Sequence, residues 1–378
     1  MSFISVWPNQ DIFCIMCSMN AVLMNPFVPH AILCALSILS LVLLKSQLRF
    51  GLFLSTAVLL AGGTAAAFSF GDDSFRILRF MAYLFFAYLP ATAAIGSLLL
   101  LRNRAWLRAF GAILLAAGLW GIAYQAFIIE PNELSVRRLK IGSPKIRSKI
   151  RVAFMSDIQS DVFGDNERRV WKALMAEKPD LILLGGDYTH EWTEEARQKV
   201  RLATREYLLK IGFKAPLGVV ALRGNVDSLA WTEMFSGTGI DVFSSRTQLR
   251  FEGGLALTLL ETQESFNGKL KVAPSEGFHL VLGHSPDYAL GQVSADLMLG
   301  GHTHGGQVRI PWFGPLFTNS RLPRLTCDGE SKFPDGRRLY VTRGAGLERK
   351  HAPRMRFLCP PEIVVLDLVP SGSAGPAS

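Results

Sequence analysis

The sequence predicts an α/β fold of two packed, mixed sheets flanked by helices and preceded by a transmembrane helical region. Two observations support this prediction. The apolar residues of the 378-residue chain are concentrated before Glu130, and the mean hydropathy of the whole chain is +0.25. From Arg151 onward, short apolar runs first alternate with helical patterns and then follow one another as strands. A chain of this length has room for two or three domains.

Four long apolar stretches make up the first part of the chain. They cover residues 27–44, 50–70, 77–101 and 106–129, with short polar breaks between them. Each is close to the length that a helix needs to cross a hydrocarbon core. Residues 1–24 are apolar as well, but they lack the basic start of a cleaved signal peptide. We therefore expect about four membrane spans within residues 1–130 of an integral membrane protein.

Basic residues follow the last apolar stretch. We interpret residues 131–150 as a juxtamembrane linker along anionic headgroups, which attract each basic residue by roughly 1 kcal/mol. The many Lys and Arg residues after the last predicted span favour a cytoplasmic position of the following domain at a bacterial inner membrane. The basic residues in the first and third loops between the predicted spans favour the opposite side. The net charge of +9 does not indicate nucleic-acid binding, because no finger, helix-turn-helix or aromatic interleaving accompanies it. Nothing in the sequence sets an oligomeric state.

Residues 151–370 read as one domain, and residues 371–378 read as a disordered tail of small residues. We expect helices over residues 166–176 and 193–209, between strands over residues 152–155, 181–184 and 219–222. Shorter strands are expected over residues 240–243, 255–261, 280–282, 297–299, 308–310, 339–342 and 363–368. Strand–helix units that lead into a strand-rich half indicate two packed sheets with helices outside.

Five short polar blocks each follow one of these predicted strands. They are Asp157-Ile158-Gln159, Gly186-Asp187, Gly224-Asn225-Val226-Asp227, Gly283-His284 and Gly301-His302-Thr303-His304. Residues at the ends of strands can converge on one edge of a sheet, where open α/β folds bind ligands. The blocks offer oxygen and imidazole ligands without a thiolate, which suits a pair of hard-to-borderline divalent ions better than a structural zinc.

The order of the blocks resembles the calcineurin-like metallophosphoesterases, whose pattern is D-x-H, G-D, G-N-H-D, G-H and G-H-x-H. The likeness covers about residues 151–367 and continues into Gly305-Gly306-Gln307, Arg343-Gly344-Ala345-Gly346 and Pro360-Pro361-Glu362-Ile363. These flanks resemble the membrane-attached branch of the family, which includes enzymes that cleave UDP-2,3-diacylglucosamine. The resemblance implies an αββα sandwich and a metal-dependent hydrolase.

The resemblance also implies a role for each block. Asp157, Gln159 and His304 would bind a first ion, Asp187 would bridge two ions, and Asn225, His284 and His302 would complete the second site. Asp187, Asn225 and Asp227 would be the catalytic residues. The cofactor would be two divalent ions, with Mn²⁺ favoured and Fe, Zn or Mg as alternatives. A metal pair of this kind clamps a phosphoryl group and activates a water molecule.

Two residues depart from the family pattern. Gln159 stands where the family has His, so either its amide oxygen binds the first ion or a water molecule takes that place. An oxygen ligand favours Mn²⁺ or Mg²⁺ over Zn²⁺. Val226 stands where the family has a catalytic His, which leaves Asp227 without its usual partner. Without that acid, the leaving group must depart unprotonated, and this favours phosphate anhydrides and activated diesters over simple monoesters.

Four further residues are candidates for substrate binding. Trp312 and Phe313 lie in an apolar, proline-flanked loop, which either contacts lipid or packs on its own domain. Arg343 and Arg349 lie in a basic cluster, which either binds phosphate oxygens or forms a solvated face. We expect His190, just after Asp187, to be a loop residue. The sequence does not decide whether Cys327 and Cys359 form a disulfide.

Together these features predict a membrane-anchored, two-metal phosphohydrolase that cleaves a phosphate anhydride or diester at the bilayer surface. The resemblance indicates UDP-2,3-diacylglucosamine as the leading substrate, which would be cleaved to lipid X and UMP in lipid A synthesis. One alternative is a broad-specificity phosphodiesterase or a lipid phosphatase. Another is a catalytically silent, metal-binding scaffold on a membrane bundle. The expected partners are the phospholipid bilayer and a phosphorylated or nucleotide-linked lipid.

Overall fold

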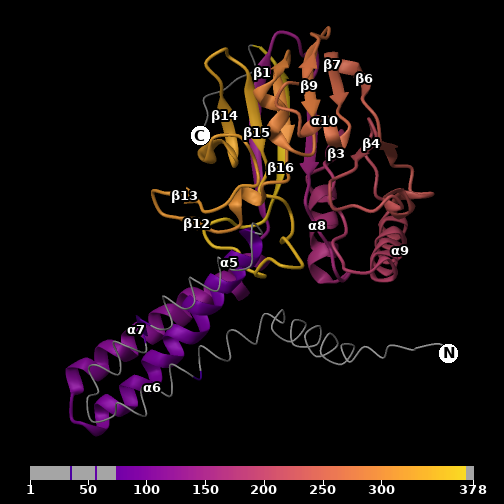
Figure 1. Cartoon of the computed structure of the whole chain (residues 1–378). Helices are drawn as coiled ribbons and strands as arrows, with labels where there is room; N and C mark the ends of the chain where they lie inside the picture. The colour runs from indigo at the N-terminus through magenta and orange to yellow at the C-terminus, as the bar shows by residue number, and fades with distance from the viewer. Residues whose placement is uncertain (1–34, 36–55, 58–73, 372–378) are drawn as a thin grey trace, which may run out of the picture. The chain divides into compact units, whose positions relative to one another are not determined.

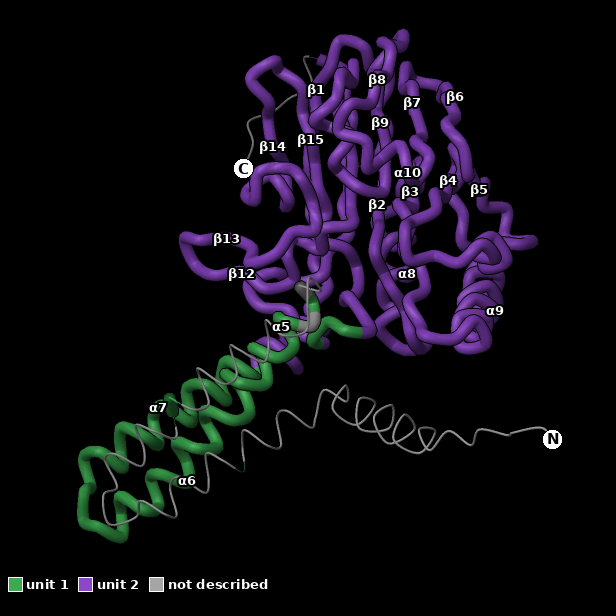
Figure 2. The backbone as a smooth tube through the Cα atoms, in the orientation of Figure 1, with its two compact units in different colours: residues 1–124, 351–353 green, residues 125–350, 354–378 purple. Residues whose placement is uncertain are grey.

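A computed structural model describes residues 74–371, together with residue 35 and residues 56–57 (Figure 1). The chain forms two compact units (Figure 2). The first comprises residues 1–124 and 351–353, and the second comprises residues 125–350 and 354–378. The spans expected over residues 27–44 and 50–70, and the tail after residue 371, lie outside the described residues.

The first unit is mostly helical over residues 74–124. It contains α5 (Ser74–Tyr83), η3 (Leu84–Tyr88), α6 (Leu89–Arg102) and α7 (Trp106–Tyr124), and Figure 1 shows α6 and α7 side by side. Two helical stretches, Ile77–Arg102 and Trp106–Asn132, are long and apolar enough to cross a membrane by length and composition. They coincide with the third and fourth expected spans. The second stretch runs on through η4 (Gln125–Ile129) and η5 (Glu130–Asn132).

The first sheet of the second unit has six strands in the order β1-β16-β2-β3-β4-β5. The strands β2, β3, β4 and β5 run parallel to one another, and β16 is antiparallel to β2. Their bounds are β1 (Ser135–Ser143), β2 (Ile150–Met155), β3 (Leu181–Leu184), β4 (Val219–Leu222), β5 (Asp241–Phe243) and β16 (Glu362–Pro370).

Strand β1 corrects the expected linker over residues 131–150. It pairs in parallel with β16 through its whole length, from Ser135 opposite Glu362 to Ser143 opposite Pro370. Ile141 is buried and Leu139 packs against the core, whereas Arg137 and Lys140 are exposed. Basic residues on the open side of an edge strand deter further strand pairing. The exposed basic side chains made this edge strand resemble a charged linker in the sequence. The folded unit therefore begins before residue 151.

The second sheet also has six strands, in the order β14-β15-β11-β9-β7-β6. It is mixed, because β7, β9, β11 and β15 are parallel while β6 and β14 are antiparallel to their neighbours. The bounds are β6 (Thr247–Phe251), β7 (Leu255–Leu259), β9 (Phe278–Leu282), β11 (Leu297–Gly300), β14 (Gly329–Lys332) and β15 (Arg338–Val341). Two short pairs stand apart, β8 (Lys271–Val272) with β10 (Gln292–Val293) and β12 (Arg309–Ile310) with β13 (Gly314–Pro315).

Alternating side chains of the strands set the layers. Val152 and Phe154 of β2 face the core between the two sheets, where they meet residues such as Leu257 and Leu280. Ala153 and Met155 face the other way, toward the helices. This is the period of two that places successive strand residues on opposite faces. Both faces of the central strands β2, β3 and β4 are thereby buried, as their unbroken apolar sequences indicate.

Helices α8 (Asp165–Ala176) and α9 (Glu194–Ile211) cover the outer face of the first sheet. The hydroxyl of Thr193 accepts the Ala196 N–H at the start of α9, and Gly212 ends that helix with φ +59°. The segment η8 (Pro286–Leu290) packs against the second sheet, and α10 (Thr262–Ser265) contacts η8. The remaining turns are η6 (Trp231–Phe235), η7 (Glu252–Gly254), η9 (His304–Gly306) and η10 (Arg324–Thr326). The predicted fold class, two mixed sheets flanked by helices, is confirmed.

Candidate metal centre

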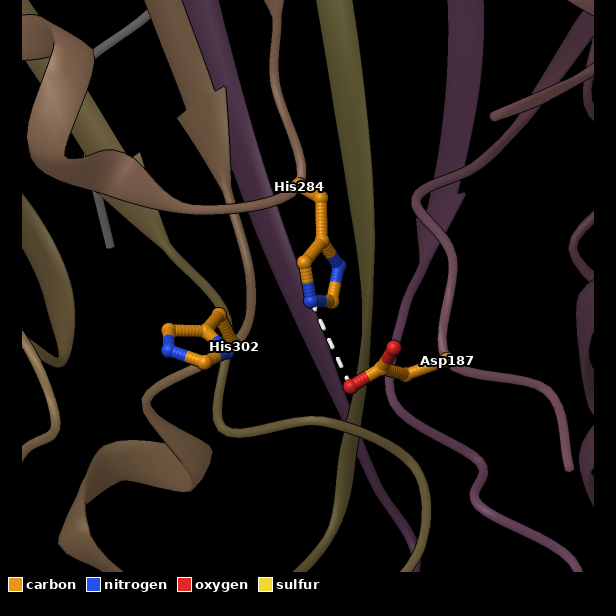
Figure 3. A group of neighbouring side chains, drawn as sticks. All are labelled: Asp187, His284 and His302. Atoms are coloured by element: carbon orange, nitrogen blue, oxygen red, sulfur yellow. Dashed lines mark ion pairs between the residues drawn. The ribbon is translucent and has the colours of Figure 1, made fainter. Parts of the chain in front are cut away.

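All five polar blocks follow strands of the two sheets. Those after β2, β3 and β4 meet at one end of the first sheet, and those after β9 and β11 meet at one end of the second. Asp187 Oδ2 lies 3.3 Å from His284 Nε2 (Figure 3). The ligand atoms of Asp187, His284 and His302 all lie within 4.8 Å of one another. Asn225 Oδ1 lies 2.8 Å from His284 Nε2, so the residues predicted for the second ion and its bridge are together.

The residues predicted for the first ion adjoin this group. His304 Nε2 lies 3.9 Å from Asp157 Oδ1, and the Gln159 amide donates to Asp187 Oδ2 at 3.2 Å. Asp157 also accepts the backbone N–H of His302 at 2.9 and 3.0 Å. The structure thus brings all seven predicted ligands into one cluster.

The backbone at this cluster is held in an unusual conformation. Five of the seven predicted ligands have φ values between +41° and +65°, namely Asp157, Gln159, Asp187, His302 and His304. Such conformations cost roughly 1–3 kcal/mol each for residues other than glycine, and they gather at functional sites. The loops are also in close contact, since a Cβ atom on Gly224 would lie 2.0 Å from Asp187 Oδ1. This contact explains the glycine that precedes Asn225.

Asp227, which the sequence predicted as a catalytic residue, lies beside this cluster and makes several hydrogen bonds. Its buried carboxylate accepts four backbone N–H groups, from Asp187 (2.7 Å), Tyr188 (2.8 Å), Gly224 (2.9 Å) and Thr189 (3.3 Å). Burial and the neighbouring Asp187 raise the pKa of Asp227 to about 6. The side chain ties the Asp187 loop to the Asn225 loop, and it is not left without partners by Val226. The Val226 N–H donates to Asp187 Oδ1 at 2.9 Å.

The electrostatics of the cluster separate its histidines. Burial lowers the pKa of His302 to about 4 and that of His304 to about 3, so both imidazoles are neutral at pH 7. Burial also opposes the charge of His284, but Asp187 outweighs it and raises the pKa of His284 to about 10. Burial and then the charge of Asp187 raise the pKa of Asp157 to about 7. In protein without metal, His284 and Asp157 therefore hold protons on atoms that would otherwise bind a cation.

One further acidic residue joins the cluster without having been predicted. Glu348 is buried, and its Oε2 lies 3.4 Å from His304 Nε2 and 3.1 Å from the Gln159 amide nitrogen that donates to it. Its Oε1 lies 3.0 Å from His190 Nδ1, so the predicted loop residue His190 also borders the site. Burial would raise the pKa of Glu348, but the hydrogen bond from His190 and the nearby histidines hold it below its usual value. The only signal in the sequence was an acid two residues after Gly346.

The predicted substrate-binding arginines have partners within the second unit. Arg343 Nε donates to Asp328 at 2.7 Å. Arg349 donates to the Gln159 carbonyl at 2.9 Å and pairs with Asp161 at 3.4 Å. Arg349 therefore supports the loop that carries Gln159, whereas Arg343 is held by a carboxylate outside the cluster.

The apolar loop lies at the surface of the second unit. Trp312, between β12 and β13, is fully exposed, and Phe313 is 50% exposed with the Arg324 guanidinium 4.1 Å from its ring centre. Of the two readings of this loop, the structure favours an exposed tip over one packed on its own domain. Cys327 and Cys359 are buried free thiols, so the disulfide that the sequence allowed between them is not formed.

The cluster fits a divalent cation. His304 Nε2 is buried and makes no hydrogen bond, although Glu348 Oε2 is near. A buried polar atom without a hydrogen bond needs an explanation, and a cation at this nitrogen is one. The other donors are carboxylate and amide oxygens and imidazole nitrogens, which suit Mn²⁺, Fe²⁺ or Zn²⁺.

Comparison with known proteins identifies the family. A model described as calcineurin-like phosphoesterase matches residues 150–306, which include all seven predicted ligands. The chain is 32% identical over 206 residues to phosphodiesterase YaeI of Escherichia coli, a match that covers 51% of this chain and 72% of YaeI. The chain belongs to the calcineurin-like metallophosphoesterases. Membership in this family of hydrolases implies divalent metal binding.

Two other relatives of this metallophosphoesterase are matched over a larger share of their own lengths. The chain is 29% identical over 282 residues to the uncharacterized metallophosphoesterase YkuE of Bacillus subtilis, across 68% of this chain and 94% of YkuE. It is 24% identical over 308 residues to UDP-2,3-diacylglucosamine pyrophosphatase LpxG of Chlamydia trachomatis, across 63% and 90%. Glu348 lies beyond the residues that the family model matches.

Proposed function

We propose that the protein is a membrane-anchored, two-metal phosphohydrolase that cleaves a phosphate anhydride or activated diester of a lipid-linked substrate. The observation that carries this proposal is the convergence of seven residues with oxygen or nitrogen donor atoms, Asp187 among them. Asp157 and His304 would hold one ion beside Gln159, and Asn225, His284 and His302 would hold the other, with Asp187 between them. When bound, such a pair supplies Lewis-acid catalysis and a nucleophilic water near neutral pH.

The surroundings of Asp187 support a preference for good leaving groups. Val226 cannot donate a proton, and the oxygens of Asp227 already accept four backbone N–H groups. Neither residue can therefore protonate the departing oxygen. A phosphate or nucleoside phosphate leaves readily without a proton, whereas an alkoxide does not. A pocket of about 220 Å³ borders Asn225 and offers space for part of a substrate.

UDP-2,3-diacylglucosamine is the leading substrate in this proposal, with lipid X and UMP as products. Support comes from the name of the relative LpxG, a UDP-2,3-diacylglucosamine pyrophosphatase. Such a substrate carries a nucleotide anhydride and acyl chains, which fits both the absence of a His at position 226 and an apolar surface near a bilayer. Purified full-length protein with Mn²⁺ should release UMP from this substrate, and its gene should rescue a bacterial strain that lacks its own enzyme for this step.

Anchoring in the membrane is supported by two apolar helices and one exposed loop. The stretches Ile77–Arg102 and Trp106–Asn132 have the length and hydropathy of membrane spans, and Trp312 and Phe313 are exposed apolar residues. We place the catalytic unit on the cytoplasmic side of a bacterial inner membrane, because basic residues follow the last span. Protease protection of the catalytic unit in right-side-out vesicles, and its cleavage in inverted vesicles, would agree with this orientation.

The second candidate is a broad-specificity phosphodiesterase, which the relative YaeI favours because it is named a phosphodiesterase. The same purified protein distinguishes the two functions. Rapid hydrolysis of bis(4-nitrophenyl) phosphate without release of UMP from the lipid substrate supports the second. Two bound metal equivalents without turnover of either compound would indicate a catalytically silent scaffold.

A further inference from the structure

Gln159 makes contacts that leave the first ion short of a ligand. Its amide nitrogen donates to Asp187 Oδ2 at 3.2 Å and to Glu348 Oε2 at 3.1 Å. Its amide oxygen lies 3.3 Å from His190 Nδ1. Two carboxylates on one side and a ring nitrogen on the other fix this orientation of the amide, because only the NH₂ end can donate to both acids. The oxygen therefore faces His190 and away from Asp187.

Glu348 is the acid that lies on the other side of this amide. Its side chain is held between His304, Gln159 and His190, and its own backbone N–H donates to Gln307 Oε1 at 2.8 Å. The turn before it is fixed to the Asp157 block, because the Gly346 N–H donates to the Asp157 carbonyl at 2.9 Å. Two segments that carry predicted ligands thus hold Glu348 in place. A buried carboxylate is costly unless it is paired with a cation or a metal.

We propose that Glu348 is a carboxylate ligand of the first ion, together with Asp157, Asp187 and His304, and that Gln159 and His190 position it. The inference rests on the proposed two-metal site. Glu348 Oε2 and His304 Nε2 are 3.4 Å apart, and two ligand atoms of one ion lie at about this separation when each is roughly 2.0–2.2 Å from the metal. The carboxylate would replace the imidazole that Gln159 cannot supply.

This arrangement changes the charge of the site. Three carboxylates, from Asp157, Asp187 and Glu348, would surround the first ion, with His304 as its imidazole. Anionic oxygen ligands favour Mn²⁺ and Mg²⁺, whereas imidazole suits Zn²⁺ and Fe²⁺. The protein would therefore favour Mn²⁺ over Zn²⁺ at this site.

The test measures metal binding by the full-length protein in detergent micelles, with Mn²⁺ as the probe. Elemental analysis gives the number of bound ions, and Mn²⁺ electron paramagnetic resonance gives their dissociation constants. In Glu348→Gln, one of two Mn²⁺ equivalents should be lost, or its dissociation constant should rise by roughly tenfold or more. In the double variant Gln159→His, Glu348→Gln, the second equivalent should return, with Zn²⁺ now preferred over Mn²⁺.

Two further variants distinguish the loss of a metal ligand from a folding defect. Glu348→Asp keeps the charge but withdraws it by one methylene, and it should weaken only one of the two Mn²⁺ ions. Glu362→Gln makes the same change at another buried carboxylate, whose partners are Tyr340 and Arg343, and it should keep both ions. Thermal unfolding of each variant, followed by circular dichroism, shows which of them fold.

The outcomes separate this inference from the proposed function. If wild-type protein binds two Mn²⁺ ions and Glu348→Gln binds both with unchanged constants, Glu348 is only a hydrogen-bond acceptor and the inference is wrong. If wild-type protein itself binds fewer than two ions, the proposed two-metal function is wrong. Loss of one ion in Glu348→Gln, with its return in the double variant, supports both.

Discussion

The carboxylate of Asp227 accepts the backbone N–H of Asp187 at 2.7 Å, and it accepts three more N–H groups from the same two loops. It therefore fixes Asp187, the residue that we propose as the bridge between two ions, in a conformation whose φ is +57°. A buried side chain in this role couples the stability of the unit to the geometry of the site. Its four contacts show that it holds these two loops together.

Removal of that carboxylate should lower both stability and metal binding. In Asp227→Ala, four buried N–H groups lose their acceptor, and each unsatisfied buried group costs roughly 1–3 kcal/mol. We expect a lower thermal unfolding temperature and weaker Mn²⁺ binding together, with no change in the shape of the pH–rate profile of any residual activity. A variant with normal stability and metal content but an altered acidic limb would show that Asp227 is a proton donor after all.

Asp187→Asn should abolish turnover and remove one metal equivalent. One neutral amide cannot offset the repulsion between two dications, and the nearby His284 loses the anion that raises its pKa to about 10. Elemental analysis of purified protein measures the loss. Asp296→Asn is the matched control, because Asp296 pairs with Lys145 and accepts the His279 N–H. Normal metal content in Asp187→Asn would contradict the bridge.

Metal binding should become weaker as the pH falls, and it should release protons. Ligands bind metal in their deprotonated forms. In metal-free protein at pH 7, His284, with a pKa of about 10, holds a proton, and Asp157, with a pKa of about 7, is half protonated. His302 and His304 are already neutral and release none. Titration calorimetry with Mn²⁺ in buffers of different ionisation enthalpy should report this release, and a heat independent of the buffer would contradict it.

The loop between β12 and β13 should matter for lipid substrates alone. Trp312→Ser, Phe313→Ser should reduce hydrolysis of an acylated nucleotide anhydride in vesicles and leave hydrolysis of a soluble aryl diester unchanged, because the exposed rings lose contact with lipid. Leu209→Ser removes a comparably exposed apolar side chain from α9 and serves as the control. Equal losses on both substrates would instead assign the loop to the catalytic site.

The sequence was most informative where local patterns and the fold agree. The apolar runs that end at Met155, Leu184 and Leu222 became parallel strands, and the polar blocks after them met because parallel strands end at the same edge. Strand β14 (Gly-Glu-Ser-Lys) was not predicted, since it is polar and exists through its pairing with β15. Strand β1 was hidden by its exposed basic residues.

In the candidate site, too, the contacts between distant parts of the chain could not be predicted. The motif predicted seven ligands, which the structure brings together, but Glu348 reaches them through a turn fixed by the Gly346–Asp157 backbone hydrogen bond. That approach depends on contacts between residues almost 200 positions apart, which no local pattern contains. The contacts of Asp227 were missed for a related reason, because its partners are backbone N–H groups, which every residue other than proline offers.

Val226 gives the sharpest test of the chemistry. Without a His at this position, the rate should fall steeply across a series of aryl phosphodiesters as the leaving phenol becomes less acidic, because the phenoxide departs unprotonated. Nucleotide anhydrides should lie at the fast end of the range and alkyl monoesters at the slow end. Val226→His keeps the backbone N–H that donates to Asp187 and adds a proton donor beside it.

We expect Val226→His to flatten the dependence on leaving-group acidity and to raise the rates of poor substrates. A positioned acid is worth roughly 10²–10⁴ in rate, but here the gain should be closer to tenfold, because Asp227 is occupied by four N–H groups and cannot orient the new imidazole. Val226→Ile, which changes the side chain without adding a proton donor, should leave the dependence as steep as in the wild type. If the wild-type protein hydrolyses alkyl monoesters as fast as anhydrides, another residue already supplies the proton, and the argument from Val226 fails.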